Sequence, residues 1–478
     1  MNYTLITAVV IYLLVTLGIG VWAGTRIKNT ADFAIAGRSL PLIMVVTTTF
    51  ATWFGAETVM GIPARFIQGG LNAIVEDPFG AGFCLVLVGM FFAARLYRLN
   101  LLTIGDYYRQ RYGKGIEIFC SVAIIFSYLG WVAAQITALG LVFSVLTNGA
   151  MPVAVGMVIG TLAVLIYVVV GGFLAVAITD FIQMIVLVIG LAIIAIFAAD
   201  LAGGADKVFA LASKEQLWNF LPPPKFHDVI FFIGAAVTMM LGSIPQQDVF
   251  QRVMSAKNAP TARAGAIIGG LSYILFAFVP MFIIGCAVLV MGESGMELVK
   301  NDYQRVLPTF VMTKMPLIMQ IIFFGALLSA IKSTSSATLL APSTSFVENI
   351  LKHLRPGMTD KQQLFAVRVS IVVFAAFVLV YAIRMQGTPI YDLVSSAYQV
   401  TLVAAFVPLV MGMYWKRATT QGAILSIAAG LITWLLFYPQ LTTWGETFPG
   451  QLAGLIAAFV GIVVGSLMPQ VLKNQKVL

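Results

Sequence analysis

Two apolar segments are interrupted by glycine and proline, the first at Ala51-Thr52-Trp53-Phe54-Gly55 and Met60-Gly61-Ile62-Pro63, the second at Leu241-Gly242-Ser243-Ile244-Pro245. A broken helix is tolerated at membrane depth only where protein buries it or where it lines a cavity. Matching interruptions in two halves of a chain indicate a binding site near the membrane midplane, between inverted repeats. Glycine and proline are common in membrane helices generally, but these segments lie five predicted spans apart, and an odd offset also inverts the topology. We therefore predict that spans two to six and seven to eleven form an inverted repeat.

The composition requires a lipid environment. Of the 478 residues, 60% are hydrophobic and 10% are charged, whereas about 25% are charged in an ordinary soluble domain. A single soluble core stops growing beyond about 250–300 residues, so it could not hide this much apolar surface. Each crossing takes roughly 20 apolar residues, which predicts an all-α polytopic membrane protein with about 13 transmembrane helices. The predicted spans are 3–23, 40–62, 70–96, 115–147, 152–171, 174–200, 228–250, 264–291, 316–351, 363–386, 389–414, 418–438 and 450–470.

The 28 Lys and Arg residues are distributed unevenly between the two sets of alternate loops. The richer set contains Arg26, Lys28, Arg38, Arg95, Arg98, Arg109, Arg111, Lys114, Arg252, Lys257, Arg263, Lys352, Arg355, Lys361, Arg368, Lys416, Arg417, Lys473 and Lys476. The positive-inside rule therefore predicts an outside N-terminus and a cytoplasmic C-terminus. Because the net charge of +9 lies in short loops rather than in a basic patch with interleaved aromatic residues, nucleic acid is not an expected partner. The short loops favour a bacterial inner membrane.

Several short windows lie in a fixed order along the chain. They are Gly37-Arg38-Ser39-Leu40-Pro41, the first interruption quoted above, Leu102-Thr103-Ile104-Gly105-Asp106-Tyr107, Gly171-Gly172-Phe173 with Ala177-Ile178-Thr179-Asp180 and Gln183, Phe250-Gln251-Arg252-Val253, Ala330 with Ser333-Thr334, and Pro408 with Tyr414-Trp415-Lys416-Arg417. In this order and spacing the chain resembles the sodium:solute symporter family, which has a LeuT-type five-plus-five inverted-repeat core with discontinuous helices. Within the family, these motif sequences are most similar to those of choline transporters, followed by those of pantothenate and proline symporters.

The resemblance implies a secondary active transporter, not an enzyme, that imports a small organic solute by alternating access coupled to sodium. It divides the single transporter domain 1–478 into an extra N-terminal helix at 1–36, a first repeat at 37–200, a second repeat at 225–416 and C-terminal helices at 417–478. The expected partners are a small-molecule substrate and membrane lipid. Whether a small membrane subunit also binds is left open.

The resemblance also implies a sodium site formed by two helices. Sodium prefers hard oxygen ligands, and a broken membrane helix supplies backbone carbonyls without formal charge. The implied ligands are the carbonyls of Ala51, Phe54 and Ala330 and the hydroxyls of Ser333 and Thr334. Independently of the family, Ser and Thr residues are dense between 329 and 338 within an apolar run. The alternative is a helix face of small residues that only packs.

Asp180 lies within an apolar run, where a lone carboxylate is costly and usually functional. The family places an acid at this position on the cytoplasmic exit path for sodium. The alternative is a structural helix cap that follows Thr179.

Lys332 departs from the family, which usually has an apolar residue before the Ser-Thr pair. A lysine at a helix centre costs about 2.5–3.5 kcal/mol by insertion scales. At about 5 Å from a bound sodium it would repel the ion by roughly 3 kcal/mol at an effective dielectric of about 20. Three alternatives follow: Lys332 points away toward an acid such as Glu57, its ammonium occupies the sodium position, or it exchanges a proton that replaces sodium. Sodium coupling is the main prediction, with a proton-coupled or sodium-independent carrier as the alternative.

Trp53 and Trp131 fall on spans that line the substrate cavity in this fold, with the acids Glu57 and Asp77 nearby. Two indoles and a carboxylate can hold an ammonium group by cation–π attraction and charge pairing, which favours a choline-like, betaine-like or amino substrate. If the tryptophans only pack and Glu57 neutralises Lys332, a carboxylate substrate is equally expected. Further polar contacts predicted from their span positions are Gln135, Ser243, Gln246 and Tyr398.

A membrane enzyme or a sensor is the remote alternative. An enzyme needs an acid, base or metal cluster at one membrane face, whereas His227 and His353 are predicted in loops on opposite sides, without ligand spacing to a partner. A sensor of this fold carries a kinase after the last span, and this sequence ends at Leu478. Both alternatives are therefore less favoured than a transporter.

Overall fold

A computed structural model of the chain describes residues 2–25, 27, 29–438 and 441–472. The α-helices are α1 Tyr3–Gly24, α2 Thr30–Ile35, α3 Leu42–Trp53, α4 Ile62–Gly69, α5 Ala81–Leu87, α6 Ala93–Arg98, α7 Ile104–Tyr112, α8 Lys114–Leu146, α9 Val153–Leu201, α10 Ala205–Lys214, α11 Phe226–Gly242, α12 Gln247–Ser255, α13 Ala259–Met291, α14 Glu293–Asn301, α15 Val306–Lys314, α16 Leu317–Phe346, α17 Lys352–Leu354, α18 Asp360–Arg384, α19 Ile390–Thr401, α20 Val407–Tyr414, α21 Thr420–Leu436 and α22 Gly450–Leu467. Short 3-10 or π-helical turns are η1 Ala36–Arg38, η2 Glu57–Gly61, η3 Leu71–Ile74, η4 Val75–Gly80, η5 Val88–Phe92, η6 Tyr303–Arg305, η7 Val347–Leu351, η8 Leu402–Phe406 and η9 Thr443–Glu446. Within the described ranges there is no strand, so the predicted all-α class is confirmed. Four basic residues used to predict the orientation, Arg26, Lys28, Lys473 and Lys476, lie outside the described residues.

The described helices account for most of the predicted spans. Nine continuous helical stretches in the described residues are long and apolar enough to cross a membrane, and two of these, Leu71–Arg98 and Ile390–Tyr414, each join several short helices and turns. Up to eleven spans result if each bent helix pair is one span. The 49 residues of α9 extend over roughly 74 Å at 1.5 Å per residue, more than twice an apolar bilayer thickness of about 30 Å. α9 is therefore long enough for two crossings, and α21 is an additional apolar helix of 17 residues. The count of about 13 follows if these are included, and it stays a prediction.

The break within α9 depends on Gly172. Its φ of 50° and ψ of −159° fall in a region that essentially only glycine adopts. A Cβ built at this position would lie 2.5 Å from the ring of Phe33 in α2. Gly172 therefore allows both the turn of the backbone and the close approach of α2.

The two interrupted segments form bent spans, so the predicted discontinuous helices are confirmed. α3 meets the helical segment 57–69 at 57°, and α11 meets α12 at 46°. The N–H of Leu40 donates to the carbonyl of Ser255 at 2.9 Å, and the N–H of Lys257 donates to the carbonyl of Leu40 at 3.0 Å. These bonds fasten the beginning of the first bent span to the end of the second.

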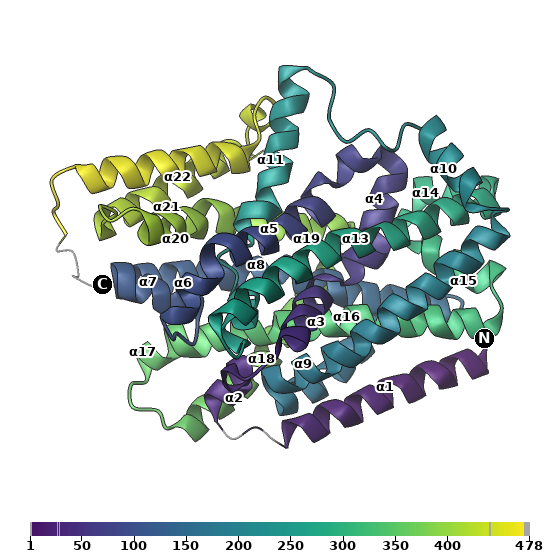
Figure 1. Ribbon diagram of the computed structural model, residues 1–478, viewed down its shortest axis with the longest axis horizontal. Helices are drawn as coiled ribbons and strands as arrows, with labels where there is room; N and C mark the ends of the chain where they lie inside the picture. The colour runs from purple at the N-terminus through teal and green to yellow at the C-terminus, as the bar shows by residue number, and fades with distance from the viewer. Residues whose placement is uncertain (1, 26, 28, 439–440, 473–478) are drawn as a thin grey trace.

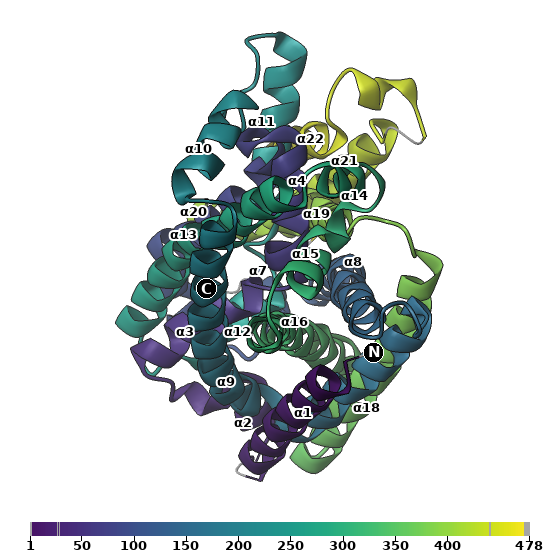
Figure 2. The same cartoon turned by 90° about the vertical axis from the view of Figure 1, so that its right-hand side faces the viewer.

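α16 lies at the centre of the molecule, packed against α3, α8 and α9 (Figure 1). Every residue from 323 to 345 in this helix is buried. α1 and the α21–α22 pair lie at opposite edges in both views (Figure 2). Exposed apolar side chains on α1, such as Leu14 and Val15, suit a helix that faces lipid. The central position of α16 brings its polar residues against the first bent span.

Candidate functional site

The predicted ion-site residues meet where α3 ends. The hydroxyl of Ser333 lies 3.0 Å from the carbonyl oxygen of Ala51 and 2.5 Å from Oδ1 of Asp180. The hydroxyl of Thr48 donates to Oδ2 of Asp180 at 2.6 Å. Three helices, α3, α9 and α16, therefore converge on one buried polar centre. Asp180 lies well inside α9, so the alternative of a helix cap is wrong.

The hydroxyl of Ser333 has one proton to share between two acceptors. A hydroxyl carries a single donor hydrogen and two lone pairs, so it cannot donate to Ala51 and to Asp180 at the same time. The shorter contact and the ionised acceptor favour donation to Asp180. The carbonyl of Ala51 and the lone pairs of Ser333 are then available to a cation.

Thr334 and Phe54 complete the same region. The hydroxyl of Thr334 is buried without a hydrogen-bond partner, although buried polar groups are normally paired. It lies beside Gly55, whose added Cβ would come within 2.6 Å of that oxygen. Phe54 has non-helical backbone angles, φ −88° and ψ 70°, because α3 ends there. Ala330 is buried on α16, one turn before this pair.

Most of the other hydroxyls in this part of α16 serve the helix itself. Ser335, Ser336 and Thr338 each donate to the carbonyl four residues earlier, as Ser and Thr often do in apolar helices. Ser329 does the same, and its hydroxyl also has a hydrogen bond with the phenol of Tyr12 in α1. Ser333 reaches α3 and α9 instead. Of the Ser and Thr residues between 329 and 338, Ser333 and Thr334 are therefore the two that lie at the candidate ion site.

Lys332 points away from this centre. Its Nζ donates to the hydroxyl of Thr16 in α1 at 2.6 Å and lies 4.3 Å from the ring centroid of Tyr167 in α9. The hydroxyl and the aromatic ring compensate part of the cost of burying the ammonium. The predicted pairing of Lys332 with Glu57 is wrong, because Glu57 binds other side chains.

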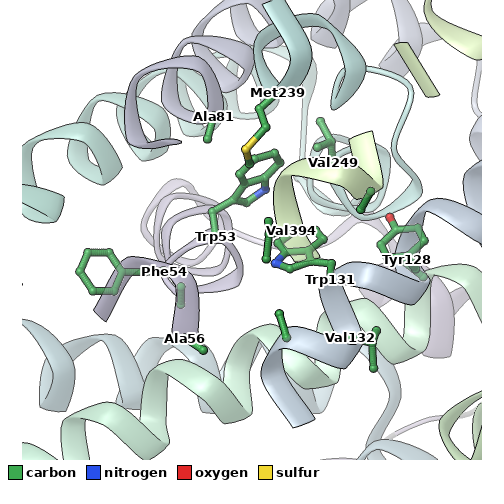
Figure 3. Packing of buried hydrophobic residues seen from close by; sticks show 14 of the residues in the cluster. Trp53, Phe54, Ala56, Ala81, Tyr128, Trp131, Val132, Met239, Val249 and Val394 are labelled. Carbon is green, nitrogen blue, oxygen red and sulfur yellow. The ribbon is translucent and has the colours of Figure 1, made fainter. Parts of the chain in front are cut away.

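An aromatic cluster occupies the region between the two bent spans. The ring centroids of Trp53 and Trp131 are 5.4 Å apart, and Tyr398 lies 6.0 Å from the first and 5.7 Å from the second. Tyr128 stacks on Trp131 at 6.2 Å. Figure 3 shows Trp53, Trp131 and Tyr128 in this region, with Val394 among them. The cluster thus joins α3, α8 and α19.

Glu57 lies directly against this cluster. Its two carboxylate oxygens accept from Nε1 of Trp131 at 2.9 Å and from Nε2 of Gln135 at 2.6 Å. The amide oxygen of Gln135 accepts the backbone N–H of Ala56 at 2.9 Å, which uses a donor freed by the break after α3. The break, Glu57 and α8 are therefore held as one unit.

Asp77 belongs to the same aromatic neighbourhood through Tyr273. The phenol of Tyr273 donates to Oδ1 of Asp77 at 2.5 Å and lies 3.0 Å from the hydroxyl of Thr58. Its ring packs edge-on against Trp53 at 6.5 Å. Tyr273 was not singled out in the sequence, because an isolated tyrosine in an apolar run has no distinguishing pattern.

The second break contributes Ser243 and Gln246. The amide nitrogen of Gln246 donates to the hydroxyl of Ser127 at 2.8 Å. The oxygen of its amide, the hydroxyl of Ser243, Nε1 of Trp53 and the phenol of Tyr398 are all buried without a hydrogen-bond partner. Such groups are uncommon in folded proteins, so they are candidates for contacts to a substrate.

Arg252 was predicted in a loop, and the structure corrects this. It lies on α12 and is 2% exposed, and its guanidinium donates to the carbonyl of Asp248 at 2.9 Å and to the hydroxyl of Thr52 at 2.5 Å. Asp248 in turn accepts from the phenol of Tyr128 at 2.5 Å. The loop assignment was wrong because the bend after α11 places the next helix inside the protein. Asp248 and Arg252 are an acid and a base four residues apart, and this spacing was the feature of the sequence that could have indicated a helix here.

His353 was also misplaced. It lies on α17, and its Nε2 is 2.7 Å from Oε2 of the buried Glu117. His227 is exposed at the beginning of α11, as expected for a surface residue. In the described residues no group of three or more His, Cys, Asp or Glu side chains could hold a metal ion.

The fold first defines the class of protein, an all-helical membrane protein with a LeuT-type inverted-repeat core. A solved structure of a Na⁺-coupled sialic acid symporter in a substrate-bound outward-open state matches with a TM-score of 0.83. The sequences are 19% identical, and the match covers 97% of each chain. At this identity the likeness shows the fold.

The chain belongs to the sodium:solute symporter family, whose model matches residues 33–430. High affinity choline transporter 1 of Homo sapiens is 26% identical over 488 residues, which cover 95% of this chain and 83% of that protein. The sodium/pantothenate symporter of Escherichia coli is 26% identical over 490 residues, 98% of each chain. The resemblance inferred from the motifs is confirmed. Because the family consists of symporters, the classification as a secondary transporter rather than an enzyme is confirmed as well.

Proposed function

We propose that this integral membrane protein couples the inward movement of sodium to the uptake of a small organic solute that carries an ammonium group. The observation that carries the proposal is the position of Ser333, between the carbonyl of Ala51 at the break of α3 and the carboxylate of Asp180. Family membership supports sodium as the coupling ion. The proposed ligands are the carbonyls of Ala51, Phe54 and Ala330 and the hydroxyls of Ser333 and Thr334.

Asp180 has two proposed roles at the ion site. By accepting a hydrogen bond from Ser333 it orients the hydroxyl so that its lone pairs face the cation. Its negative charge also attracts the ion through a polar path that includes Thr48. The orientation of Lys332 toward Thr16 favours this sodium-coupled carrier over one in which a proton or the lysine ammonium replaces sodium.

The charge around the aromatic cluster supports an ammonium-bearing substrate. Glu57 places a carboxylate beside Trp131, and the carboxylate of Asp77 accepts a hydrogen bond from the phenol of Tyr273. Among the described residues, the cation–π contacts of lysine and arginine involve none of the rings of Trp53, Trp131 or Tyr398. Aromatic faces and an uncompensated carboxylate suit choline-like cations, betaine-like zwitterions or amino acids. The unpartnered donors of Trp53, Ser243 and Tyr398 favour the zwitterions as a second candidate.

The proposed organisation follows the family. Residues 37–200 and 225–416 form the two repeats, with an extra helix at 1–36 and C-terminal helices at 417–478. The matching bends of 57° and 46° support this division. We also propose a bacterial inner membrane, with the N-terminus outside and the C-terminus in the cytoplasm, on the basis of the loop charges.

The ion site is tested by thermal unfolding of the purified protein in NaCl and in KCl. A ligand that binds only the folded state raises stability by RT ln(1 + [L]/Kd), about 2.7 kcal/mol at a concentration 100 times Kd. We expect a sodium-specific rise for the wild type and none for Ser333→Ala combined with Thr334→Ala. Ser335→Ala is the matched control, because Ser335 donates only to its own helix. A sodium shift that persists in the double variant would exclude these ligands.

The substrate class is tested in NaCl with choline, glycine betaine, proline and pantothenate. We expect stabilisation by a compound with an ammonium group and none by pantothenate. Glu57→Gln should abolish the effect, because the new amide loses the negative charge and presents a donor to Trp131 or Gln135. Stabilisation by pantothenate alone would refute the ammonium-bearing class while leaving the sodium test unaffected.

A further inference from the structure

A large apolar groove lies on the outer side of α16 and α18, away from the ion and substrate centre. Its volume is about 1110 Å³, above the roughly 300–1,000 Å³ of common small-molecule pockets. The walls are mainly apolar and aromatic, with Phe346, Phe365, Val373 and Phe377 among them. Phe365, Val373 and Phe377 are 69%, 62% and 57% exposed. The groove therefore opens toward the lipid.

Two positively charged side chains lie at one end of this groove. Arg355 and Lys361 line it and are exposed, and neither side chain has an ion pair or hydrogen bond with another described residue. The nearby basic residue Lys352 is different, because it pairs with Glu348 at 3.0 Å. Asp360 accepts the N–H of Thr30 in α2. The end of the groove thus carries two positive charges that the described protein does not neutralise.

The length of the groove matches one leaflet of a bilayer. Lys361 and Phe377 lie sixteen residues apart on α18, which corresponds to roughly 24 Å at 1.5 Å per residue. One leaflet of a bilayer, with its headgroup region included, is about 20–22 Å thick. A cationic end followed by an apolar wall of this length suits a headgroup with its acyl chains below.

We propose that this groove binds an anionic phospholipid, with the phosphate on Arg355 and Lys361 and an acyl chain along α18. Guanidinium groups bind phosphate oxygens in pairs, and basic pockets between transmembrane helices hold anionic headgroups. The lipid would contact α18 and, through Pro342 and Phe346, α16. Because α16 also carries Ser333 and Thr334, the bound lipid stabilises the helix that supplies the ion-site hydroxyls.

The proposal is tested by titrating the detergent-purified full chain with phosphatidylglycerol or phosphatidylcholine, and measuring thermal unfolding and bound lipid by native mass spectrometry. We expect saturable binding and stabilisation by phosphatidylglycerol only. In Arg355→Gln combined with Lys361→Gln, its dissociation constant should rise about 30-fold, because each basic residue contributes about 1 kcal/mol. Lys416→Gln with Arg417→Gln is the matched control, since these residues are exposed and do not line the groove.

Two further measurements distinguish an anionic lipid from a free phosphate ion and from charge attraction without a groove. Val369→Trp fills the lipid-facing wall without changing the charge, and it should weaken binding of phosphatidylglycerol while Arg355 and Lys361 are intact. Inorganic phosphate alone should not stabilise the protein. Equal stabilisation by phosphatidylcholine, equal stabilisation by inorganic phosphate, or unchanged binding in the Arg355/Lys361 double variant would each overturn the proposal.

Discussion

Asp180 is the residue whose charge matters most to the proposed ion site. It lies 2.5 Å from the hydroxyl of Ser333, so an ion on that hydroxyl would be about 5 Å away, an attraction of roughly 3 kcal/mol at an effective dielectric of about 20. Asp180→Asn keeps the shape and removes the charge. We expect sodium affinity, measured by titrating thermal unfolding with NaCl, to fall at least about tenfold. Asp206→Asn, an exposed change on α10, is the control, and equal affinity in the two variants would contradict the prediction.

Substitution of Lys332 tests whether its ammonium group occupies the sodium position. Its ammonium bonds to Thr16 in α1, whereas the adjacent Ser333 faces Ala51 and Asp180. We therefore expect Lys332→Met to keep the sodium-specific rise in unfolding temperature that the wild type shows over KCl. If the rise occurs in the Met variant and is absent from the wild type, the ammonium occupies the ion position and the sodium-coupled proposal fails.

At the scale of elements, the break within α9 requires glycine at position 172. Gly172 has a backbone conformation that costs other residues about 1–3 kcal/mol, and an added Cβ would meet the ring of Phe33 at 2.5 Å. We expect Gly172→Ala to lower the free energy of unfolding by more than about 2 kcal/mol. Gly325→Ala is the control, because no atom lies within 4 Å of its added Cβ in the helical α16. It should be neutral or stabilising by up to about 1 kcal/mol. Similar unfolding temperatures for both variants would show that the kink is not strained.

At the scale of the whole molecule, alternating access should change exposure at the breaks. Ser243 is buried at the bend between α11 and α12, and the three native cysteines, Cys84, Cys120 and Cys286, are buried too. A Ser243→Cys variant therefore reports labelling by a water-soluble maleimide over a low background. We expect the labelling rate to differ between NaCl and KCl, because rocking of one repeat against the other opens the central site on one side at a time. Equal rates in both salts, with or without substrate, would argue against sodium-dependent gating at this bend.

The candidate site was predictable where chemistry is local in the sequence. Ala51 and Ser333 were implied by the family resemblance, with which the broken span and the dense hydroxyls agree, and Asp180 was also indicated as a lone acid in an apolar run. The structure brings the three within hydrogen-bond distance. Tyr273 and Arg252 were missed or misplaced. Their roles depend on contacts with α3 and η4 that neither residue's own neighbours in sequence reveal.

The sequence by itself determined the membrane environment, the all-helical class, the two bent spans and the family. These follow from apolar runs, glycine and proline, and ordered motifs, all of which act along the chain. Only the tertiary structure decided which way Lys332 points, which hydroxyls leave their own helix, and that Glu57 binds Trp131 and Gln135. The reason is that neighbouring positions on a helix are rotated by about 100°, so adjacent residues such as Lys332 and Ser333 face different partners, and the surrounding helices decide what each one meets.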